Sequence, residues 1–392
     1  MATLPGASHH LGDYPIDQFL ARFWQQQPLY IKGALGDWAV PIDAGHLAGL
    51  ACEPEAESRL VSGPYADGGW KVCHGPFAES DFTDPPEVPW TLLVQGVDKL
   101  IPDFDTLIER FRFLPDWRLD DLMISYAVTG GSVGPHCDEY DVFLIQAAGR
   151  RQWQIDAGVS RQAELVPDLA LRILRNFTPQ EGWILEPGDA LYLPPGVAHH
   201  GVALDDTCMT LSVGFRSPSW AELMSGFGDA LLELATGSSR YTDEGAEPTP
   251  HPGTLAVEVR RRIRAEITDL LLRHADAFDQ WLGRYLTEPK INLAPHGCKQ
   301  PVAWRGEHGH FRRNQSSRLI FAASEDGTGG WLFADGEQHT LAKALLDGAE
   351  FLADHRVFRF QDLPRNSDEV ALANLLDALL ESGSLEWVDD SE

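Results

Sequence analysis

Between about residues 120 and 215, apolar residues occur in short runs that are separated by glycine and proline turns. This pattern predicts a β domain, because short strands need frequent tight turns between them. Strands are expected at 122–128, 142–146, 151–155, 190–193 and 209–215. Many short strands with even turns favour a sandwich or jelly roll. Upstream, the apolar spacing over residues 14–35 predicts a helix followed by a strand.

After Ser217 the apolar positions begin to recur at helical spacing. Ser219 and Glu222 have the spacing of a capping box, and a first helical face runs from Leu223 to Leu234. A polar loop at 238–253 with three prolines follows, and then a second long helix whose apolar side runs from residue 255 to residue 286. Two amphipathic helices with little else to pack on suggest a dimerisation element. The alternative is that they cover the β domain of their own chain.

A third unit is expected from about residue 295. A hairpin at 318–323 and 331–334, helices at 341–353 and 367–381, the second beginning at Ser367, and a strand at 385–388 fit a small winged-helix-like domain. Residues 321–392 hold 16 Asp and Glu against 4 Lys and Arg, which is the wrong surface for DNA. A protein-binding or structural role is therefore expected for this part.

These patterns predict a mostly β fold with α-helices, in three parts. A chain of 392 residues agrees with two or three domains of ordinary size. We place the β domain at 1–216, a helical dimerisation region at 217–292 and the winged-helix-like domain at 293–392.

The net charge of -28 changes the picture of the partners. A surface this acidic repels phosphate backbones, so direct binding of nucleic acid is not expected. It attracts basic partners and speeds their approach. Solubility, or a saline habitat, is the other explanation of the same charge.

The cysteines and the chain's start point to the cytoplasm. The five cysteines are scattered and form no C-x-x-C, which fits a reducing compartment without a disulfide framework or a zinc knuckle. The first residues lack the basic and apolar segments of a signal peptide. No apolar stretch approaches the roughly 18 residues of a membrane span.

The segment Gly130-Gly-Ser-Val-Gly-Pro-His136-Cys-Asp138 carries the candidate chemistry. On a strand, residues i and i+2 face the same side, so His136 and Asp138 both enter the domain interior while Cys137 points away. A turn, strand and Pro-Pro-Gly turn then lead to His199 on a neighbouring strand. Two imidazoles and one carboxylate leave three metal positions open, which is the ligand set of non-heme Fe(II) oxygenases.

His199 and His200 compete for the third place. His199 is preferred because it follows the Pro-Pro-Gly turn at the usual spacing, and His200 would point to the other face. The tripeptide H-x-D alone is weak evidence. It becomes strong together with P-G-D and P-P-G-x-x-H at jelly-roll distance.

The open metal positions suit 2-oxoglutarate and O2. A dicarboxylate cosubstrate needs a cation deep in the domain for its far carboxylate, and Arg150 and Arg151 are the candidates. They alternate in direction, so only one of them enters. Arginine suits a bidentate grip on a carboxylate. Ser125 could donate to the same group, and Thr210 lies on the closing strand after His199.

Long runs of the sequence resemble the bacterial ribosomal oxygenases, which belong to the cupin-like JmjC group of 2-oxoglutarate oxygenases. The likeness is dense over about residues 15–230. It is carried by residues 58–62, 74–77, 114–125, 133–143, 194–199, 212–216 and 223–227. Family members often have a bulky aliphatic residue between the first two ligands; here it is Cys137, which is expected to face outward.

The resemblance implies a JmjC double-stranded β-helix, a helical dimerisation region and a C-terminal winged helix. It implies that His136, Asp138 and His199 hold the iron. It also implies that Arg151 rather than Arg150 holds 2-oxoglutarate, with Thr210 at the family's strand position near the cosubstrate. Similar bacterial members hydroxylate an arginine at C3 in the sixteenth protein of the large ribosomal subunit, so the expected substrate is a ribosomal protein and the expected assembly a homodimer.

Three other functions remain as alternatives. Related oxygenases hydroxylate a ribosomal histidine or demethylate lysine, with the same iron site. A metal-binding cupin without redox turnover usually has three or four histidines with a glutamate, and lacks the deep arginine. An acidic protein-binding module with a relic jelly roll would have no need of the triad together with Arg151.

Overall fold

The computed structural model describes residues 10–36, 38–66, 68–158, 164–234, 240–242, 248, 251–289 and 308–390, with the side chains of 233 and 234 excepted. Cys298 and the boundary predicted at residues 292 and 293 lie outside these ranges. The chain forms two compact units, Met1–Ser217 and Pro218–Glu392. Among the described residues, every helix is too short or too polar to cross a membrane.

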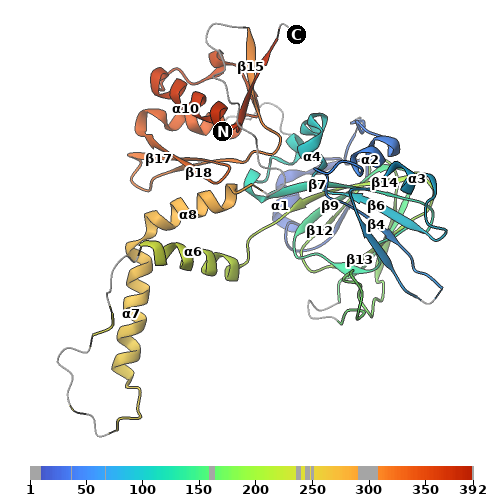
Figure 1. Cartoon of the computed structure of the whole chain (residues 1–392), viewed down its shortest axis with the longest axis horizontal. Helices are drawn as coiled ribbons and strands as arrows, with labels where there is room; N and C mark the ends of the chain where they lie inside the picture. Colours follow the sequence, from blue (N-terminus) through green and yellow to red (C-terminus); the bar gives the residue numbers. More distant parts are fainter. Residues whose placement is uncertain are drawn as a thin grey trace. The chain divides into compact units, whose positions relative to one another are not determined.

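In the described part of the first unit, two large antiparallel sheets form the body, and a third sheet pairs only His10–Leu11 with Tyr14–Pro15 (Figure 1). The larger has the order β3 (Leu29–Ile31), β12 (Ala190–Leu193), β9 (Asp141–Ala148), β14 (Cys208–Phe215), β7 (Leu119–Ala127), β6 (Trp90–Val94), β4 (Ser58–Ser62) and β5 (Lys71–His74). The smaller has the order β11 (Glu181–Leu185), β10 (Arg151–Asp156), β13 (Ala198–Ala203) and β8 (His136–Cys137). The mostly β fold predicted from the sequence is confirmed, as are all five predicted strands.

The alternation of side chains along β9 divides the core between the two faces of the larger sheet. Val142 and Leu144 pack with Trp153 and Ile155 of the smaller sheet, in the space between the sheets. Phe143 and Ile145 point the other way, into a second and larger cluster. Each fully buried side chain of this kind stabilises the fold by roughly 1.5–3 kcal/mol. The space between the sheets is the interior in which the candidate site lies.

Short helices and turns from the first 118 residues cover the outer face of the larger sheet. Their buried members include Phe19, Leu47, Phe104 and Leu107, which belong to the same cluster as Phe143. The elements are β1 (His10–Leu11), β2 (Tyr14–Pro15), α1 (Ile16–Arg22), α2 (Ala44–Leu50), α3 (Glu79–Thr83), α4 (Val97–Leu100), α5 (Asp105–Ile108) and the 3-10 turns Pro102–Phe104, Glu109–Phe111 and Asp116–Arg118. The predicted helix and strand within 14–35 are confirmed.

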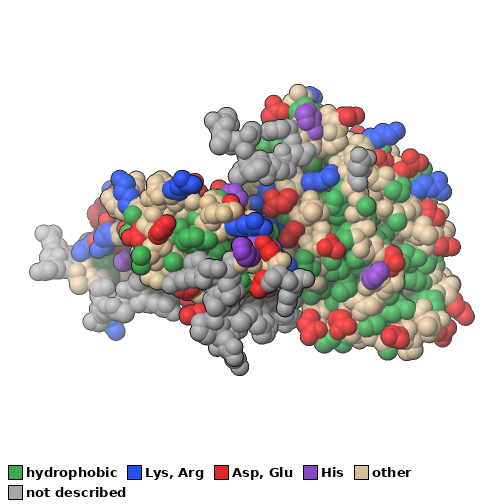
Figure 2. Space-filling model, turned by 90° about the horizontal axis from the view of Figure 1, so that it is seen from above, with side chains coloured by type: hydrophobic (Ala, Val, Ile, Leu, Met, Phe, Trp, Pro, Cys, Tyr) green, Lys and Arg blue, Asp and Glu red, His purple; other side chains and the backbone are tan. Residues whose placement is uncertain are grey.

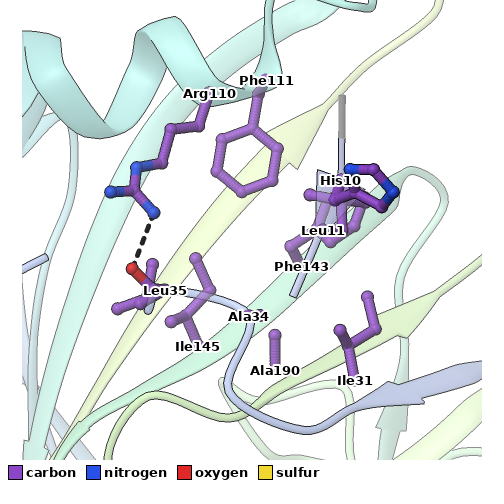
Figure 3. A pocket seen from close by; sticks show the side chains of 10 residues that line it. All are labelled: His10, Leu11, Ile31, Ala34, Leu35, Arg110, Phe111, Phe143, Ile145 and Ala190. Atoms are coloured by element: carbon purple, nitrogen blue, oxygen red, sulfur yellow. Dashed lines mark hydrogen bonds between the residues drawn. The ribbon is translucent and has the colours of Figure 1, made fainter. Parts of the chain in front are cut away.

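A small cavity lies on this covered outer face (Figure 3). Phe143, Ile145 and Ala190 line it from the sheet, and an Arg110 Nη1 donates a hydrogen bond of 2.6 Å to the carbonyl of Leu35 beside it. Its volume of about 20 Å³ is room for one or two water molecules. It lies on the opposite side of the larger sheet from His199, so it is no part of the candidate site.

A buried carboxylate ties the start of β9 to the covering segments. Asp141 is fully buried and accepts hydrogen bonds from Arg118 Nη2 at 3.0 Å, Tyr192 Oη at 2.6 Å and Gln25 Nε2 at 3.0 Å. Burial raises the pKa of Asp141, and these three donors oppose the rise. Because each donor comes from a different segment, this one side chain fixes how the covering layer meets the strand that follows Asp138.

The second unit begins with the predicted capping box. The Ser219 amide donates to Glu222 Oε2 at 2.6 Å, and the Glu222 amide donates to Ser219 Oγ at 3.1 Å. The helix behind it is α6 (Trp220–Leu234). The prediction of one long helix over 255–286 is wrong, because the chain leaves helical geometry at His274 (φ -112°, ψ 31°) and forms α7 (Val257–Arg273) and α8 (Ala275–Thr287).

Packing explains this break. The Phe278 and Trp281 rings of α8 lie 4.9 and 5.6 Å from the Phe227 ring of α6. Gly283 lies so close to Phe333 that an added Cβ would be 2.2 Å from its ring. α7 buries none of its side chains in this chain. The apolar spacing continues through residue 274, so the sequence offers no stop signal there.

Residues 308–390, the described part of the rest of this unit, hold two three-stranded sheets and two α-helices. The elements are β15 (Gly309–Arg313), β16 (Leu319–Ala323), β17 (Gly329–Ala334), β18 (Glu337–Ala342), the 3-10 turns Lys343–Leu345 and Phe360–Asp362, α9 (Leu346–Asp354), β19 (Val357–Phe358), α10 (Glu369–Ser382) and β20 (Leu385–Asp389). The β16–β17 hairpin and the last strand are confirmed. The helix predicted from residue 341 begins only at Leu346. Leu341 is still part of β18, where it lies opposite Gly330 of β17.

The start of α10 also differs from the prediction. Its N-cap is Asp368, whose carboxylate accepts from the amides of Val370 and Ala371 at 3.1 Å. Ser367, which was expected to begin the helix, has a buried hydroxyl without a partner. An ionised carboxylate interacts with the positive end of the helix dipole as well as with the free amides, so it is the better cap.

Candidate active site

Strand pairing brings the three predicted metal ligands together. β8 and β13 run antiparallel with His136 directly opposite His199, and their ring centroids are 4.3 Å apart. Asp138 follows β8, with Oδ1 3.9 Å from Nε2 of His136 and Oδ2 3.5 Å from Nε2 of His199. The three possible ligand atoms all lie within 4.8 Å of one another. This is the arrangement of a facial triad, with one side open.

Backbone carbonyls orient both imidazoles. Nδ1 of His136 lies 2.9 Å from the Gly134 carbonyl oxygen, and Nδ1 of His199 lies 3.0 Å from that of Val197. A carbonyl only accepts, so each Nδ1 carries the proton and each Nε2 keeps its lone pair for a metal. Gly134 makes this possible, because its φ of +78° suits glycine and an added Cβ would lie 2.8 Å from Ile173.

Burial favours the neutral form of the His199 imidazole. The side chain is 2% exposed, and burial lowers its pKa to about 4, with the charge of His136 acting in the same direction and Asp138 opposing. The uncharged imidazole is the form that binds a metal. His200 points to the outer face of the smaller sheet, where its ring meets Phe177 edge-on at 6.0 Å. The structure therefore brings His199, and not His200, to the cluster.

The Pro-Pro-Gly turn holds the two ligand segments against each other. The Gly196 amide donates a hydrogen bond of 2.8 Å to the carbonyl of Asp138. Gly196 has a φ of +84°, which the turn requires and which glycine adopts without strain. The turn that precedes His199 thus fixes the backbone of Asp138.

Arg151 reaches the same interior as the triad. Arg151, Trp153 and Ile155 share one face of β10, and Ile155 lies directly opposite His199. The Arg151 guanidinium lies 5.4 Å from the centre of the Trp153 ring, which lies 5.8 Å from the His199 ring. The Trp153 ring therefore lies between the Arg151 guanidinium and the His199 ring.

The buried charge of Arg151 has no counter-ion. The side chain is 5% exposed, its Nη1 lies 3.4 Å from Ser125 Oγ, and its buried Nε has no partner. No carboxylate of the described residues pairs with it. Burial lowers the pKa of Arg151, which expresses the cost of an uncompensated cation. A buried arginine of this kind fits the far carboxylate of a dicarboxylate ligand.

Arg150 does not enter the interior. Its side chain is 53% exposed, and its Nε lies 3.5 Å from Asp205 Oδ2. Ser125 and Thr210 are directly opposite each other on β7 and β14, and both are buried. The Thr210 hydroxyl donates to Gln146 Oε1 at 3.1 Å. The three predicted cosubstrate residues therefore lie on strand faces that point into the space between the two sheets, and Arg151 contacts Ser125.

Two further residues of this interior were missed from the sequence. Trp153 separates Arg151 from His199, and Gly201 accommodates it, because an added Cβ at 201 would lie 2.6 Å from the Trp153 ring. The alternation rule that places Arg151 inside also places Trp153 inside, so the signal was available. Nothing in the sequence marks Gly201, because its neighbour comes from the adjacent strand.

Comparisons with known proteins agree with this geometry. The JmjC domain family matches residues 106–223, which contain all of the residues above. The ribosomal protein uL16 3-hydroxylase of Escherichia coli (strain K12) is 41% identical over 283 residues, which are 71% of this chain and 73% of that protein. The chain belongs to the JmjC-domain ribosomal oxygenases. A probable ribosomal oxygenase of Haemophilus influenzae is 35% identical over 67% of this chain and 65% of its own length.

Solved ribosomal oxygenases share the fold over nearly the whole chain. The X-ray structure of E. coli ycfD has a TM-score of 0.84 at 34% identity and covers 96% of this chain and 99% of its own. E. coli YcfD in complex with cobalt and 2-oxoglutarate has a TM-score of 0.80 at 34% identity, covering 95% and 98%. A further YcfD structure holds cobalt and succinic acid.

The adjacent histidines provide a matched test of the metal centre. We expect His199→Ala to weaken binding of Co(II) by more than a hundredfold, because even residues that only support a metal ligand change the affinity by roughly 10–100-fold. His200→Ala should bind Co(II) within about threefold of the wild type. Anaerobic calorimetric titration measures both. Equal weakening by the two substitutions would contradict the assignment of His199.

Proposed function

We propose that this chain is an Fe(II)- and 2-oxoglutarate-dependent hydroxylase of a ribosomal protein. His136, Asp138 and His199 would hold the iron, and Arg151 with Ser125 would hold the far carboxylate of 2-oxoglutarate. Thr210 would line the same cavity. The observation that carries the proposal is a buried arginine without a counter-ion, in the same interior as an open facial triad. A relative solved with cobalt and 2-oxoglutarate supports it.

The residues around the centre prepare it for this chemistry. Bound iron would use 2-oxoglutarate and O2 to hydroxylate a C–H bond, giving succinate and carbon dioxide. The three protein ligands leave room for both reactants, because they lie on one side of the metal. Arg151 would fix the orientation of the cosubstrate through two parallel hydrogen bonds. Trp153, which is 4% exposed, excludes water from the wall between them.

The proposed substrate is the large-subunit protein uL16, hydroxylated at C3 of an arginine. The relative with 41% identity is named as a uL16 3-hydroxylase. A Caenorhabditis elegans protein named as a lysine-specific demethylase and histidyl-hydroxylase is 37% identical over only 26% of this chain, which leaves a histidine as the alternative. The net charge of -28 favours a basic substrate. Figure 2 shows acidic side chains scattered over the visible face.

Turnover of uL16 is the direct test. Protein loaded with Fe(II) should add 16 Da to uL16 in the presence of 2-oxoglutarate and O2, because one oxygen atom is inserted, and fragment spectra should place it on an arginine. Oxidation of a histidine instead would contradict the arginine assignment. Metal binding without consumption of 2-oxoglutarate would favour a non-redox cupin.

The adjacent arginines allow a matched test of the cosubstrate site. Arg151→Met should raise the KM for 2-oxoglutarate by at least about tenfold, since it removes a charge-assisted pair worth roughly 1.5–3 kcal/mol. Arg150→Met removes the same charge from an exposed position and should leave this KM within twofold. Assays of succinate formation measure both. A larger effect at Arg150 would refute the proposed role of Arg151.

We also propose that the helical region forms a homodimer. α7 extends away from α6 and α8 (Figure 1) and leaves Ile263 and Ile267 41% and 57% exposed. On α6, Trp220 and Met224 are 84% and 67% exposed. Neighbouring exposed apolar side chains of this kind mark interaction surfaces. The arginines at 260–262 and 264 of α7 and the acids at 222 and 229 of α6 are complementary in charge, which favours α7 on α6 of a second copy.

Replacing one face of α7 should dissociate this dimer. The pair of substitutions Ile263→Asp and Ile267→Asp buries charge in the contact and should give monomers in sedimentation velocity. Thr268→Asp lies about 100° round the helix from Ile267 and should leave the dimer intact. A wild-type chain that sediments as a monomer at micromolar concentration would contradict the proposal.

The remaining assignments are proposals of the same kind. We place the protein in the cytoplasm, in agreement with its relation to a hydroxylase of a ribosomal protein. Neither nucleic acid nor a membrane is proposed as a direct partner, because the chain is strongly acidic. The catalytic domain is proposed to span 1–216, the dimerisation region 217–292 and the winged-helix-like domain 293–392.

A further inference from the structure

The larger sheet extends beyond the enclosed interior by three strands. Past β7 come β6, β4 and β5 in order, and Figure 1 shows β4, β6 and β7 side by side. In this ladder Ser125 of β7 lies opposite Leu93, Leu93 opposite Arg59, and Arg59 opposite His74. Directly opposite residues share a face, so Arg59 and His74 lie on the face of the sheet that carries Ser125.

Burial changes sharply along this row. Ser125 and Leu93 are each 4% exposed, whereas Arg59 and His74 are exposed. Strands are about 4.8 Å apart, so Arg59 starts roughly 10 Å from Ser125 across the sheet. The row therefore leads from the cosubstrate wall to solvent, and Arg59 stands at the rim. Burial raises the pKa of Tyr140. The charge of Asp138 raises this pKa further, and the charge of Arg59 lowers it.

The Arg59 side chain differs from several other arginines of the first unit in its pairing. No side-chain hydrogen bond or ion pair joins Arg59 or His74 to any described residue, although the backbones of both are paired in the sheet. Arg112, Arg118 and Arg175 of the same unit each pair with a carboxylate. Residues 1–217 hold 30 Asp and Glu against 14 Lys and Arg, so acids are plentiful. A cation left unpaired at the rim of the site is available to a ligand.

We propose that Arg59, with His74 beside it, binds an acceptor oxygen of the protein substrate and so sets the register of the substrate chain at the site. This inference rests on the proposed hydroxylase function and adds a specificity residue to it. The acidic surface attracts any basic chain without regard to register. A guanidinium fork is directional, because it donates its N–H groups in one plane to an acceptor such as a carboxylate or carbonyl oxygen. The acceptor is thus an acidic side chain of the substrate or a main-chain carbonyl.

The test compares Arg59→Gln with Arg59→Lys and with Arg22→Gln, a control on α1 that removes one exposed charge from the outer face of the sheet. Binding of uL16 is measured anaerobically with Mn(II) and 2-oxoglutarate bound. Arg59→Gln should weaken uL16 binding by roughly tenfold, the loss of one charged hydrogen bond, and Arg59→Lys should recover part of it. The KM for 2-oxoglutarate and the melting temperature should not change.

The substrate's own acids identify the acceptor. If uL16 variants with Asp or Glu near the oxidised residue changed to amides lose the same affinity, and Arg59→Gln adds no further loss, the acceptor is a carboxylate. If these variants bind normally while Arg59→Gln stays weak, it is a carbonyl. Wild-type protein that oxidises uL16 while Arg59→Gln binds it equally well overturns the Arg59 inference alone. Wild-type protein that neither binds nor oxidises uL16 overturns the proposed substrate.

Discussion

The candidate site depends on one register, the antiparallel pairing of β8 with β13 that puts His136 opposite His199. Side chains alternate along a strand, so a slip of one residue would place Cys137 opposite His199 and turn His136 outward. β8 has only two residues and cannot hold this register alone. Two other interactions fix this register. The Gly196 amide donates a hydrogen bond to the Asp138 carbonyl, and β13 pairs along its length with β10.

Charge acts on this molecule at two scales. At the surface the excess of acidic residues attracts positive charges within about a Debye length, 8–10 Å. This attraction does not select one orientation of the partner. In the interior one arginine lies buried without a counter-ion, where a charge interaction is many times stronger than in water. The nearby Asp205 pairs with the exposed Arg150 and not with Arg151. In the proposed function, the surface charge attracts a basic protein substrate and the buried Arg151 binds a dianionic cosubstrate.

Local rules were enough for the features that depend on one stretch of chain. The spacing of two placed His136 and Asp138 on one side, and the five apolar runs located five of the strands. His136 and His199 were expected on neighbouring strands, but the bounds and register of β8 and β13 were not predicted, because their pairing joins partners far apart along the chain. The helix break at His274 was not predicted for a related reason. It depends on the packing of α8 against Phe227 and Phe333, which lie on other elements. Gly201 and Trp153 are likewise a pair made by two strands.

Two carboxylates three residues apart show how far such reasoning reaches. Asp138 and Asp141 look alike in the sequence, yet one faces the interior with its oxygens toward two imidazoles, and the other is buried on the outer face by Arg118, Tyr192 and Gln25. They do not share a strand, because Asp138 follows β8 of the smaller sheet and Asp141 begins β9 of the larger sheet. What alternation does not decide is which face is enclosed by the second sheet. That follows from β10 and β13, so the chemistry of Asp138 is a property of the assembled domain and not of its motif.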